Sequence, residues 1–460
     1  MKALFNNFLL SGLAVIASAS LSPAQDSEAT RLLKARSAEF QEEVLQVADN
    51  VYVAVGFGVS PSSMIVGTDG VIIVDTMIDT DSAERALAAF RKITDKPVKG
   101  IIFTHGHGDH ISGARAFIGD EPPQIWARDN FGAEGSTFKG ALLTIQNVRG
   151  VRQGGFKLPP EQRINNGVAK AYYPKRGGEV FSGGGDQKVE PTHTFSEPRK
   201  QIEIAGVKID LVAVEGETAD ALYVWLPEQK VLFSGDNFYK SWPNAYAIRG
   251  TPYRDIRSWA QANDIMAKEG AEVLVPGHTR PITGKDEVHQ ALTDYRDAIR
   301  FVFDKTIEGI NKGMTPDMLV GYVKLPAELA EKDYLREYYG NVEWAVRAIF
   351  DGYLGWFDGN PSNLFPLPPE EEAKRMAKLA GGEAALLELA RQALADGDAQ
   401  WSAQLCDHLL ALDRQAREPK LIKADALTVL AENLITATGR NYYLTYAQEL
   451  RAVADAKGNP

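Results

Sequence analysis

The sequence predicts an α/β protein in which an αββα sandwich is followed by an all-α helical domain. Between residues 51 and 233, short β-branched runs alternate with turn residues and few helical segments intervene. After about residue 286, almost every window shows helical periodicity instead. The 460 residues are enough to bury more than one core. We therefore divide the chain into a leader (1–24), a sandwich domain (25–285) and a helical domain (286–460).

The sandwich is predicted from a succession of short strands. Apolar and β-branched runs predict strands at residues 51–55, 63–66, 71–75, 100–104, 202–204, 208–214, 221–226, 231–234 and 273–275. Between the third and fourth of these, residues 82–93 carry apolar side chains at helical spacing. Many strands with few helices between them favour two sheets that pack on each other and are flanked by helices.

The helical domain is predicted from periodicity that continues almost to the end of the chain. Its clearest helices are expected at residues 341–359, 370–379, 383–396, 400–412 and 419–438. A proline-rich stretch, residues 360–369, separates two helical groups. The helix pair at residues 383–413 is similar to a tetratricopeptide hairpin but shows no strict period. We interpret this domain as a module for oligomerisation rather than for chemistry.

Charge and cysteine content limit the possible functions. The chain carries 50 Lys and Arg against 61 Asp and Glu, a net charge of −11. Without clustered basic residues, a nucleic-acid-binding surface is not expected. The single cysteine, Cys406, allows no disulfide within the chain and is expected in the core.

The first residues have the pattern of a secretory signal peptide. Lys2 is followed by the apolar residues 8–19 and by the small residues Ser22-Pro23-Ala24 before a cleavage site, and cleavage after Ala19 also fits. The apolar stretch is shorter than the roughly 20 residues needed to span a bilayer. We therefore expect a periplasmic or secreted protein without stable membrane insertion.

A dense group of metal-ligating side chains follows the strand expected at residues 100–104. His105, His107, Asp109 and His110 lie between glycines, on a loop at a strand exit. Burying so many polar side chains is unfavourable unless a cation balances them. Imidazole and carboxylate ligands suit zinc or a similar borderline metal. The segment therefore predicts a metal site, and the alternative is a solvated polar loop.

The spacing His-x-His-x-Asp-His after a strand resembles the signature of the metallo-β-lactamase superfamily. That resemblance implies further ligands in three later segments: Glu217 in residues 216–220, Asp236 in residues 233–236 and His278 in residues 276–278. Glu215 is a rival for the first place, and Glu217 is preferred because it directly precedes Thr218.

The same resemblance implies two divalent metal ions. The expected assignment is one ion on His105, His107 and Glu217 and the other on Asp109, His110 and His278, with Asp236 bridging both. The three carboxylates and a bridging hydroxide then balance the charge of the two ions. Zinc is expected first, with manganese or iron as alternatives because a glutamate in a histidine position holds a hard ion better.

Two features resemble the alkyl sulfatase family more than the antibiotic-hydrolysing enzymes. One is the glutamate at position 217, and the other is the segment 243–250, which resembles that family's sulfate-holding segment. The planar fork of Arg249 suits two sulfate oxygens, and Asn244 is expected to donate to a third. Tyr246 is a candidate acid for the leaving alcohol or a wall for an alkyl chain. Similar segments also lie at residues 152–160, 191–195, 338–340, 353–361 and 440–444.

This resemblance covers roughly residues 45–455 and implies a function. The protein is expected to cleave small amphiphilic sulfate esters to an alcohol and inorganic sulfate through a metal-bound hydroxide, with Asp109 both a ligand and a catalytic residue. The helical domain implies a homodimer. Four aromatic side chains are candidates either for the wall of the alkyl pocket or for the core: Phe238, Trp242, Tyr172 and Tyr173.

The chain also departs from the family pattern. Asp236 stands where those enzymes tend to have glutamate, and the sequence stops at Pro460 without the usual sterol-carrier-like domain. A lactamase- or lactonase-type hydrolase using the same metals is therefore an alternative. A binding protein with a structural metal site is a second one, although a closed structural site needs only four ligands.

Overall fold

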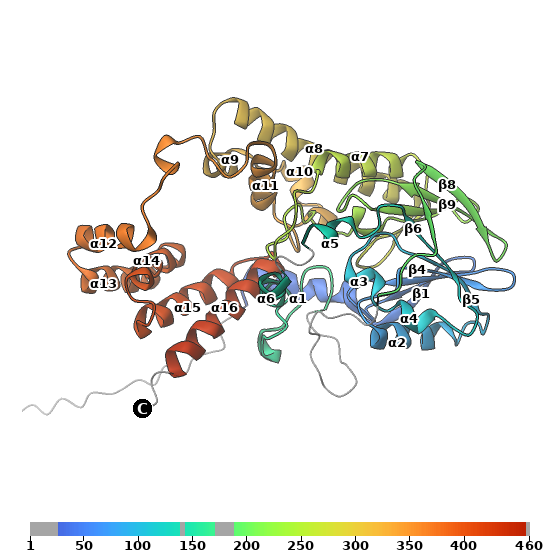
Figure 1. Ribbon diagram of the computed structural model, residues 1–460, viewed down its shortest axis with the longest axis horizontal. Helices are drawn as coiled ribbons and strands as arrows, with labels where there is room; N and C mark the ends of the chain where they lie inside the picture. The colour runs from blue at the N-terminus through green and yellow to red at the C-terminus, as the bar shows by residue number, and fades with distance from the viewer. Residues whose placement is uncertain (1–25, 139–142, 171–187, 457–460) are drawn as a thin grey trace, which may run out of the picture.

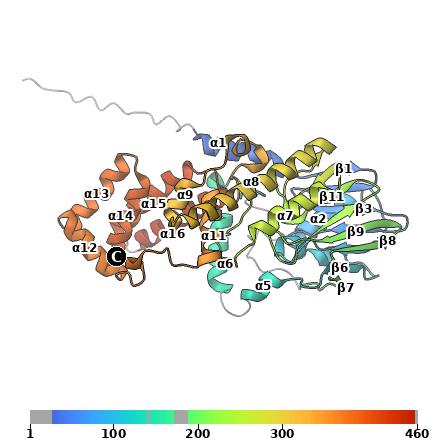
Figure 2. The same ribbon diagram turned by 90° about the horizontal axis from the view of Figure 1, so that it is seen from above.

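The computed structural model of the protein describes residues 26–138, 143–170 and 188–456. The described chain is elongated, with the sheets at one end and the helices of residues 369–412 at the other (Figures 1 and 2). The leader predicted at residues 1–24 lies outside the described residues and stays a prediction.

The first sheet follows chain order from β1 to β7. Its strands are β1 (Glu43–Ala48), β2 (Val51–Val55), β3 (Ser62–Val66), β4 (Val71–Val74), β5 (Val98–Ile102), β6 (Gln124–Arg128) and β7 (His193–Phe195). Strands β1 to β4 pair antiparallel, whereas β4 to β7 pair parallel. Parallel neighbours need crossover connections, and α2 (Thr80–Phe90) provides the one from β4 to β5. The next crossover carries α3 (Gly108–Ile111) and α4 (Ala114–Phe117).

The second sheet has the order β13-β12-β11-β10-β9-β8. Its strands are β8 (Arg199–Ile204), β9 (Val207–Ala213), β10 (Leu222–Leu226), β11 (Val231–Phe233), β12 (Val273–Val275) and β13 (Ile282–Thr283). Strands β11 and β12 are parallel and are connected through α7 (Ile256–Ala267). The other neighbours are antiparallel.

Apolar side chains fill the space between the two sheets. Val53 and Ile72 from the first sheet share one buried cluster with Leu211 and Val224 from the second. Helices α2 and α4 cover the outer face of the first sheet, and α7 and α8 (Lys285–Asn311) cover the second. This layering confirms the predicted αββα sandwich.

The remaining helices lie mostly after the sandwich. They are α1 (Glu28–Arg36), α5 (Ala133–Phe138), α6 (Leu143–Gly154), α9 (Pro316–Tyr322), α10 (Ala327–Ala330), α11 (Val342–Leu354), α12 (Pro369–Ala380), α13 (Glu383–Ala395), α14 (Ala399–Leu412), α15 (Arg417–Glu432) and α16 (Ala437–Ala456). The predicted all-α region is therefore confirmed.

Two helix ends differ from prediction for local reasons. The helix expected at residues 341–359 ends at Leu354, because Gly355 adopts a φ of 76° that continues no helix. The helix expected at residues 419–438 is two helices, since α15 ends at Glu432 and α16 begins at Ala437.

The helical region packs directly on the sandwich. Arg152 of α6 pairs with Glu449 of α16 at 2.6 Å. The Thr30 hydroxyl of α1 donates to a Glu432 carboxylate oxygen at 3.0 Å. Helix α8 starts at the predicted domain boundary, yet its buried side chains share a core with β9 to β12 and with α11. The two parts therefore form one continuous body along α8.

Along the described residues, no helix combines the length and the apolarity that crossing a bilayer requires.

Candidate metal centre and substrate pocket

The first group of expected ligands lies where β5 leaves the first sheet. His105 and His110 are buried, and Asp109 and His110 lie on the short helix α3. Asp75, at the end of β4, holds this loop because the Thr104 backbone N–H and hydroxyl donate to its carboxylate at 2.9 and 2.8 Å. The backbone of Asp75 has a φ of 56°, a conformation that non-glycine residues adopt mainly where the surroundings enforce it.

The other expected ligands come from loops of the second sheet. Glu217 lies between β9 and β10, Asp236 follows β11 in a short 3-10 turn, and His278 follows β12. Since β11 and β12 are parallel, their carboxyl ends lie at the same edge. Gly277 permits the close approach there, because a Cβ at that position would lie 2.1 Å from Asp236 Oδ1. The topology thus brings distant residues to one edge of the sandwich.

The structure brings all the expected ligands together in two adjoining groups. One group is His105, His107, Glu217 and Asp236, and the other is Asp109, His110 and His278, with ligand atoms within 4.8 Å of one another in each. Asp236 lies between them, because its two oxygens are 3.2 Å from His110 Nε2 and 3.3 Å from His278 Nε2. Glu215 is exposed and lies outside both groups.

In three of these histidines, a contact to a neighbouring residue holds one ring nitrogen, which leaves the other ring nitrogen to bind a cation. His110 Nδ1 is 2.7 Å from Asp75, and His107 Nε2 is 3.1 Å from Glu134. His278 Nδ1 is 2.9 Å from the Val59 carbonyl oxygen. These contacts fix the ring orientations in the way that metal-ligating histidines require.

Two buried atoms in the centre support a cation there. His110 Nε2 and Asp236 Oδ1 form an ion-pair contact at 3.2 Å, and neither makes a hydrogen bond of good geometry with the described residues. Imidazole nitrogens and carboxylate oxygens are ligands that zinc and similar divalent ions accept. The side chains therefore fit divalent metal ions, and the assignment of each ligand to one ion stays a prediction.

The pKa shifts in the centre reflect the mixture of carboxylates and imidazoles. Burial by itself would lower the pKa of His107, but the Glu134 and Glu217 carboxylates raise it to about 10. Burial would raise the pKa of Asp236, yet His278 and His110 hold it well below its usual range. The carboxylates therefore favour positive charge on the atoms that protons and metal ions compete for.

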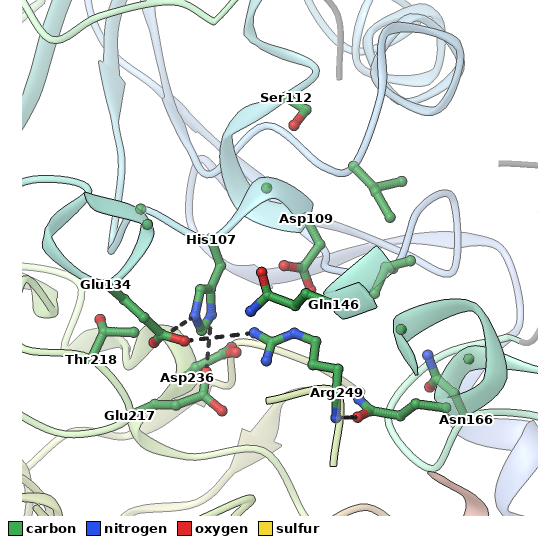
Figure 3. A pocket seen from close by; sticks show the side chains of 18 of the residues that line it. His107, Asp109, Ser112, Glu134, Gln146, Asn166, Glu217, Thr218, Asp236 and Arg249 are labelled. Atoms are coloured by element: carbon green, nitrogen blue, oxygen red, sulfur yellow. Dashed lines mark hydrogen bonds and ion pairs between the residues drawn. The ribbon is translucent and has the colours of Figure 1, made fainter. Parts of the chain in front are cut away.

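A pocket of about 420 Å³ opens beside the metal ligands. His107, Asp109, Glu217 and Asp236 line it, and the Arg249 side chain extends toward His107 and Glu134 (Figure 3). Arg249 therefore lies next to the candidate metal centre, as expected from the sequence.

Asn244 and Tyr246 differ from expectation, since neither is among the residues that line the pocket in the described structure. Asn244 is buried, and its backbone anchors the segment. Its N–H donates to the Tyr239 hydroxyl at 2.6 Å, and its carbonyl accepts from Arg254 at 2.9 Å. Of the segment 243–250, Arg249 lines the pocket.

The apolar wall also comes from other residues than predicted. Phe238 and Trp242 are fully buried in the sandwich core, and Tyr172 and Tyr173 lie outside the described residues. The apolar lining instead consists of Val59, Ile78, Val151, Phe156 and Tyr339. Tyr339 and Thr438 belong to the helical domain, so this domain helps to form the pocket as well.

Sequence reasoning missed three charged residues of the centre: Asp75, Glu134 and Arg254. Asp75 is the last residue of a predicted buried strand, and that position was a usable signal. Glu134 and Arg254 carry no such signal. Their segments have no ligand spacing, and Glu134 lies 120 residues from Arg254 in sequence although the two side chains are 3.5 Å apart.

The αββα sandwich and the candidate metal ligands at its edge are together typical of a metallohydrolase. The metallo-beta-lactamase superfamily model matches residues 55–278, and the alkyl sulfatase dimerisation model matches residues 315–453. A linear primary-alkylsulfatase from a Pseudomonas species is 37% identical over 84% of this chain and 73% of that protein. An (R)-specific secondary-alkylsulfatase from Pseudomonas is 31% identical over 89% of this chain and 62% of that protein.

A solved structure agrees with these relatives. The stereoselective inverting sec-alkylsulfatase Pisa1 from Pseudomonas has a TM-score of 0.84 and 28% identity over 93% of this chain and 69% of that one. The chain therefore belongs to the alkylsulfatase family of the metallo-β-lactamase superfamily.

Replacing Gly277 by alanine tests whether Asp236 holds metal. The new Cβ would displace Asp236, and we expect metal affinity to fall by about tenfold or more. Chelator competition on the folded variant measures this, with circular dichroism as the check on folding. Gly119→Ala is the matched control, because a Cβ at position 119 meets nothing within 4 Å. Unchanged affinity in Gly277→Ala would remove Asp236 from the ligand set.

Proposed function

We propose that the protein hydrolyses alkyl sulfate esters to an alcohol and inorganic sulfate with the help of two divalent metal ions, zinc first among them. The observation that carries the proposal is the position of Arg249. Its guanidinium lies in the pocket beside the candidate metal ligands, and its Nη1 is buried without a hydrogen-bond partner in the described part of the chain.

Arg249 is held in place by contacts that leave part of its fork available. Its backbone N–H donates to the Gln153 side chain at 3.0 Å, and Nη2 is 3.7 Å from a Glu134 oxygen. A sulfate monoester carries one negative charge on terminal oxygens, and a guanidinium matches two such oxygens at once. The free donor therefore suits the anionic end of the substrate.

The ligand set supports hydrolysis. Divalent ions in such a set lower the pKa of water and thereby supply a nucleophile at neutral pH. Asp109 and Asp236 line the same pocket as Arg249, so a sulfate group bound there lies next to the ligands. In the net reaction one proton of the water ends on the alcohol, the other is released to solvent, and sulfate leaves as the dianion.

The apolar wall suits the alcohol part of such a substrate. Val151 and Phe156 line the same pocket as Arg249, and Tyr339 adds an aromatic surface from the helical domain. Burial of alkyl carbons against these side chains contributes about 0.8 kcal/mol for each CH₂. We therefore propose a small amphiphilic sulfate ester as the substrate class.

We also propose a homodimer that forms through the helical domain. Trp356 and Phe365, in the connection between α11 and α12, are 73% and 94% exposed. Both residues fall inside the segment that matches the alkyl sulfatase dimerisation model. Large apolar side chains that are this exposed are candidates for a surface that binds a partner. Export through a leader at residues 1–24 completes the proposal, supported by the sequence pattern alone.

Arg249→Ala tests the sulfate-binding role. We expect turnover of an alkyl sulfate to fall by about 100-fold or more, whereas hydrolysis of a neutral ester or lactone changes little. Sulfate release, metal content and a β-lactam substrate are measured in parallel. Arg257→Ala is the control, since that side chain is 60% exposed and lies outside the pocket. Equal losses on charged and neutral substrates would contradict the assignment.

The double substitution Trp356→Ser and Phe365→Ser tests the dimer. Removing both aromatic side chains deletes exposed apolar area without entering a core, so we expect monomers that keep their melting temperature. Light scattering coupled to size-exclusion chromatography measures the mass. Ile93→Ser, an exposed position on the sandwich, serves as the control. A variant that stays dimeric would place the interface elsewhere.

A further inference from the structure

Four side chains form a closed ring around one side of the candidate metal centre. His107 Nδ1 is 3.2 Å from Glu217 Oε2, and Glu217 Oε1 accepts from Arg254 Nη1 at 2.6 Å. Arg254 Nη2 is 3.5 Å from Glu134, whose Oε2 is 3.1 Å from His107 Nε2. Figure 3 shows His107, Glu134 and Glu217 facing one another in this ring.

Arg254 is buried as deeply as the ligand it contacts. Its side chain is 3% exposed, as is that of Glu217, and Glu134 is 14% exposed. A guanidinium out of water is unfavourable unless carboxylates compensate for it. Burial opposes the charge, but Glu217 and Glu134 raise the pKa of Arg254 further above its usual value. The ring therefore contains a permanent positive charge next to the candidate centre.

The two oxygens of Glu217 have different surroundings. Oε1 contacts Arg254, and it also lies 3.5 Å from the Tyr239 hydroxyl. Oε2 faces His107 and is the oxygen left for the ligand group. Glu217 thus presents one ligand atom toward the centre, as a histidine would. The Arg254 guanidinium offsets the negative charge of the Glu217 carboxylate, which a neutral histidine would not carry.

Glu134 links the ring to the substrate pocket. Its Oε2 orients His107 by accepting from Nε2, which leaves Nδ1 toward the centre. Its Oε1 accepts from the Thr251 hydroxyl at 3.1 Å and lies 3.7 Å from Arg249. Arg254 in turn donates to the Asn244 carbonyl at 2.9 Å. The segment from residue 244 to 251 is therefore tied to the same two side chains.

We propose that Arg254 is the positioning residue that allows a carboxylate at position 217 to serve as a one-atom metal ligand, with Glu134 orienting both Arg254 and His107. The proposal rests on the metal site of the proposed function and is independent of the substrate. Metal affinity tests it, and loss of sulfatase activity alone does not.

The test combines Arg254→Met with Glu217→His in a double-mutant cycle. Metal affinity is measured by chelator competition with Zn²⁺ on the full chain. We expect Arg254→Met to weaken affinity by about tenfold or more when Glu217 is present. In the E217H background, the same change should weaken affinity by less than about threefold or increase it, because a neutral imidazole needs no compensating cation. Losses that agree within about twofold in the two backgrounds, or no loss beside Glu217, overturn the proposal.

Further variants separate this role from folding. Arg440→Met removes another buried arginine, one that contacts Thr30 and Glu432 in the helical region, and should leave metal affinity unchanged. Arg254→Lys keeps the charge but loses the fork, so it should restore less than half of the lost binding free energy. If Arg254→Met does not fold, Glu134→Gln replaces it in the cycle. Glu134→Gln should also weaken metal affinity by about tenfold, and unchanged affinity in that variant contradicts the proposal.

Discussion

The repulsion among three carboxylates at one buried edge is the constraint on which this structure depends. Asp109, Glu217 and Asp236 converge there, and protein groups offset their charges only in part. Imidazoles satisfy some of the oxygens, and Arg254 satisfies one oxygen of Glu217. Buried charge of this density is stable only when cations complete the balance. The two sheets supply the rigidity, because Glu217 and Asp236 lie on loops that leave strands of a packed core, and Asp109 lies on α3, which follows β5.

The candidate metal ligands and the residues of the pocket wall, which are expected to select the substrate, lie in different parts of the structure. The candidate metal ligands lie on loops at the sandwich edge, whereas the pocket wall combines α6, the segment around Arg249 and the helical domain. Glu134 contacts both the candidate metal centre and the pocket wall, since one oxygen faces His107 and the other faces Arg249. In this way the proposed sulfate-binding group is placed relative to the ligands by one carboxylate rather than by a long chain of contacts.

The sequence was informative where the signal was local. The strand at residues 51–55 and the ligand loop from His105 to His110 depend on patterns within a few residues, and both lie as predicted. Family resemblance supplied Glu217, Asp236 and His278, which spacing alone does not identify. Glu134 and Arg254 escaped prediction because only the fold brings them together. Asn244 was expected in the pocket because its side chain suits sulfate, yet it is buried and its backbone contacts Tyr239 and Arg254. The break between α15 and α16 falls in a stretch whose apolar residues keep helical spacing, so the periodicity alone did not reveal it.

The presence of Tyr339 and Thr438 in the pocket wall has a consequence for how such enzymes diversify. A substitution at Thr438 of α16 changes the cavity wall at a residue that belongs to neither candidate ligand group. Selection for a longer, shorter or branched alcohol therefore has a route that leaves the reactive chemistry intact. Enzymes of this kind that differ in substrate range would then differ in the residues of these helices and keep the same ligand residues at the sandwich edge.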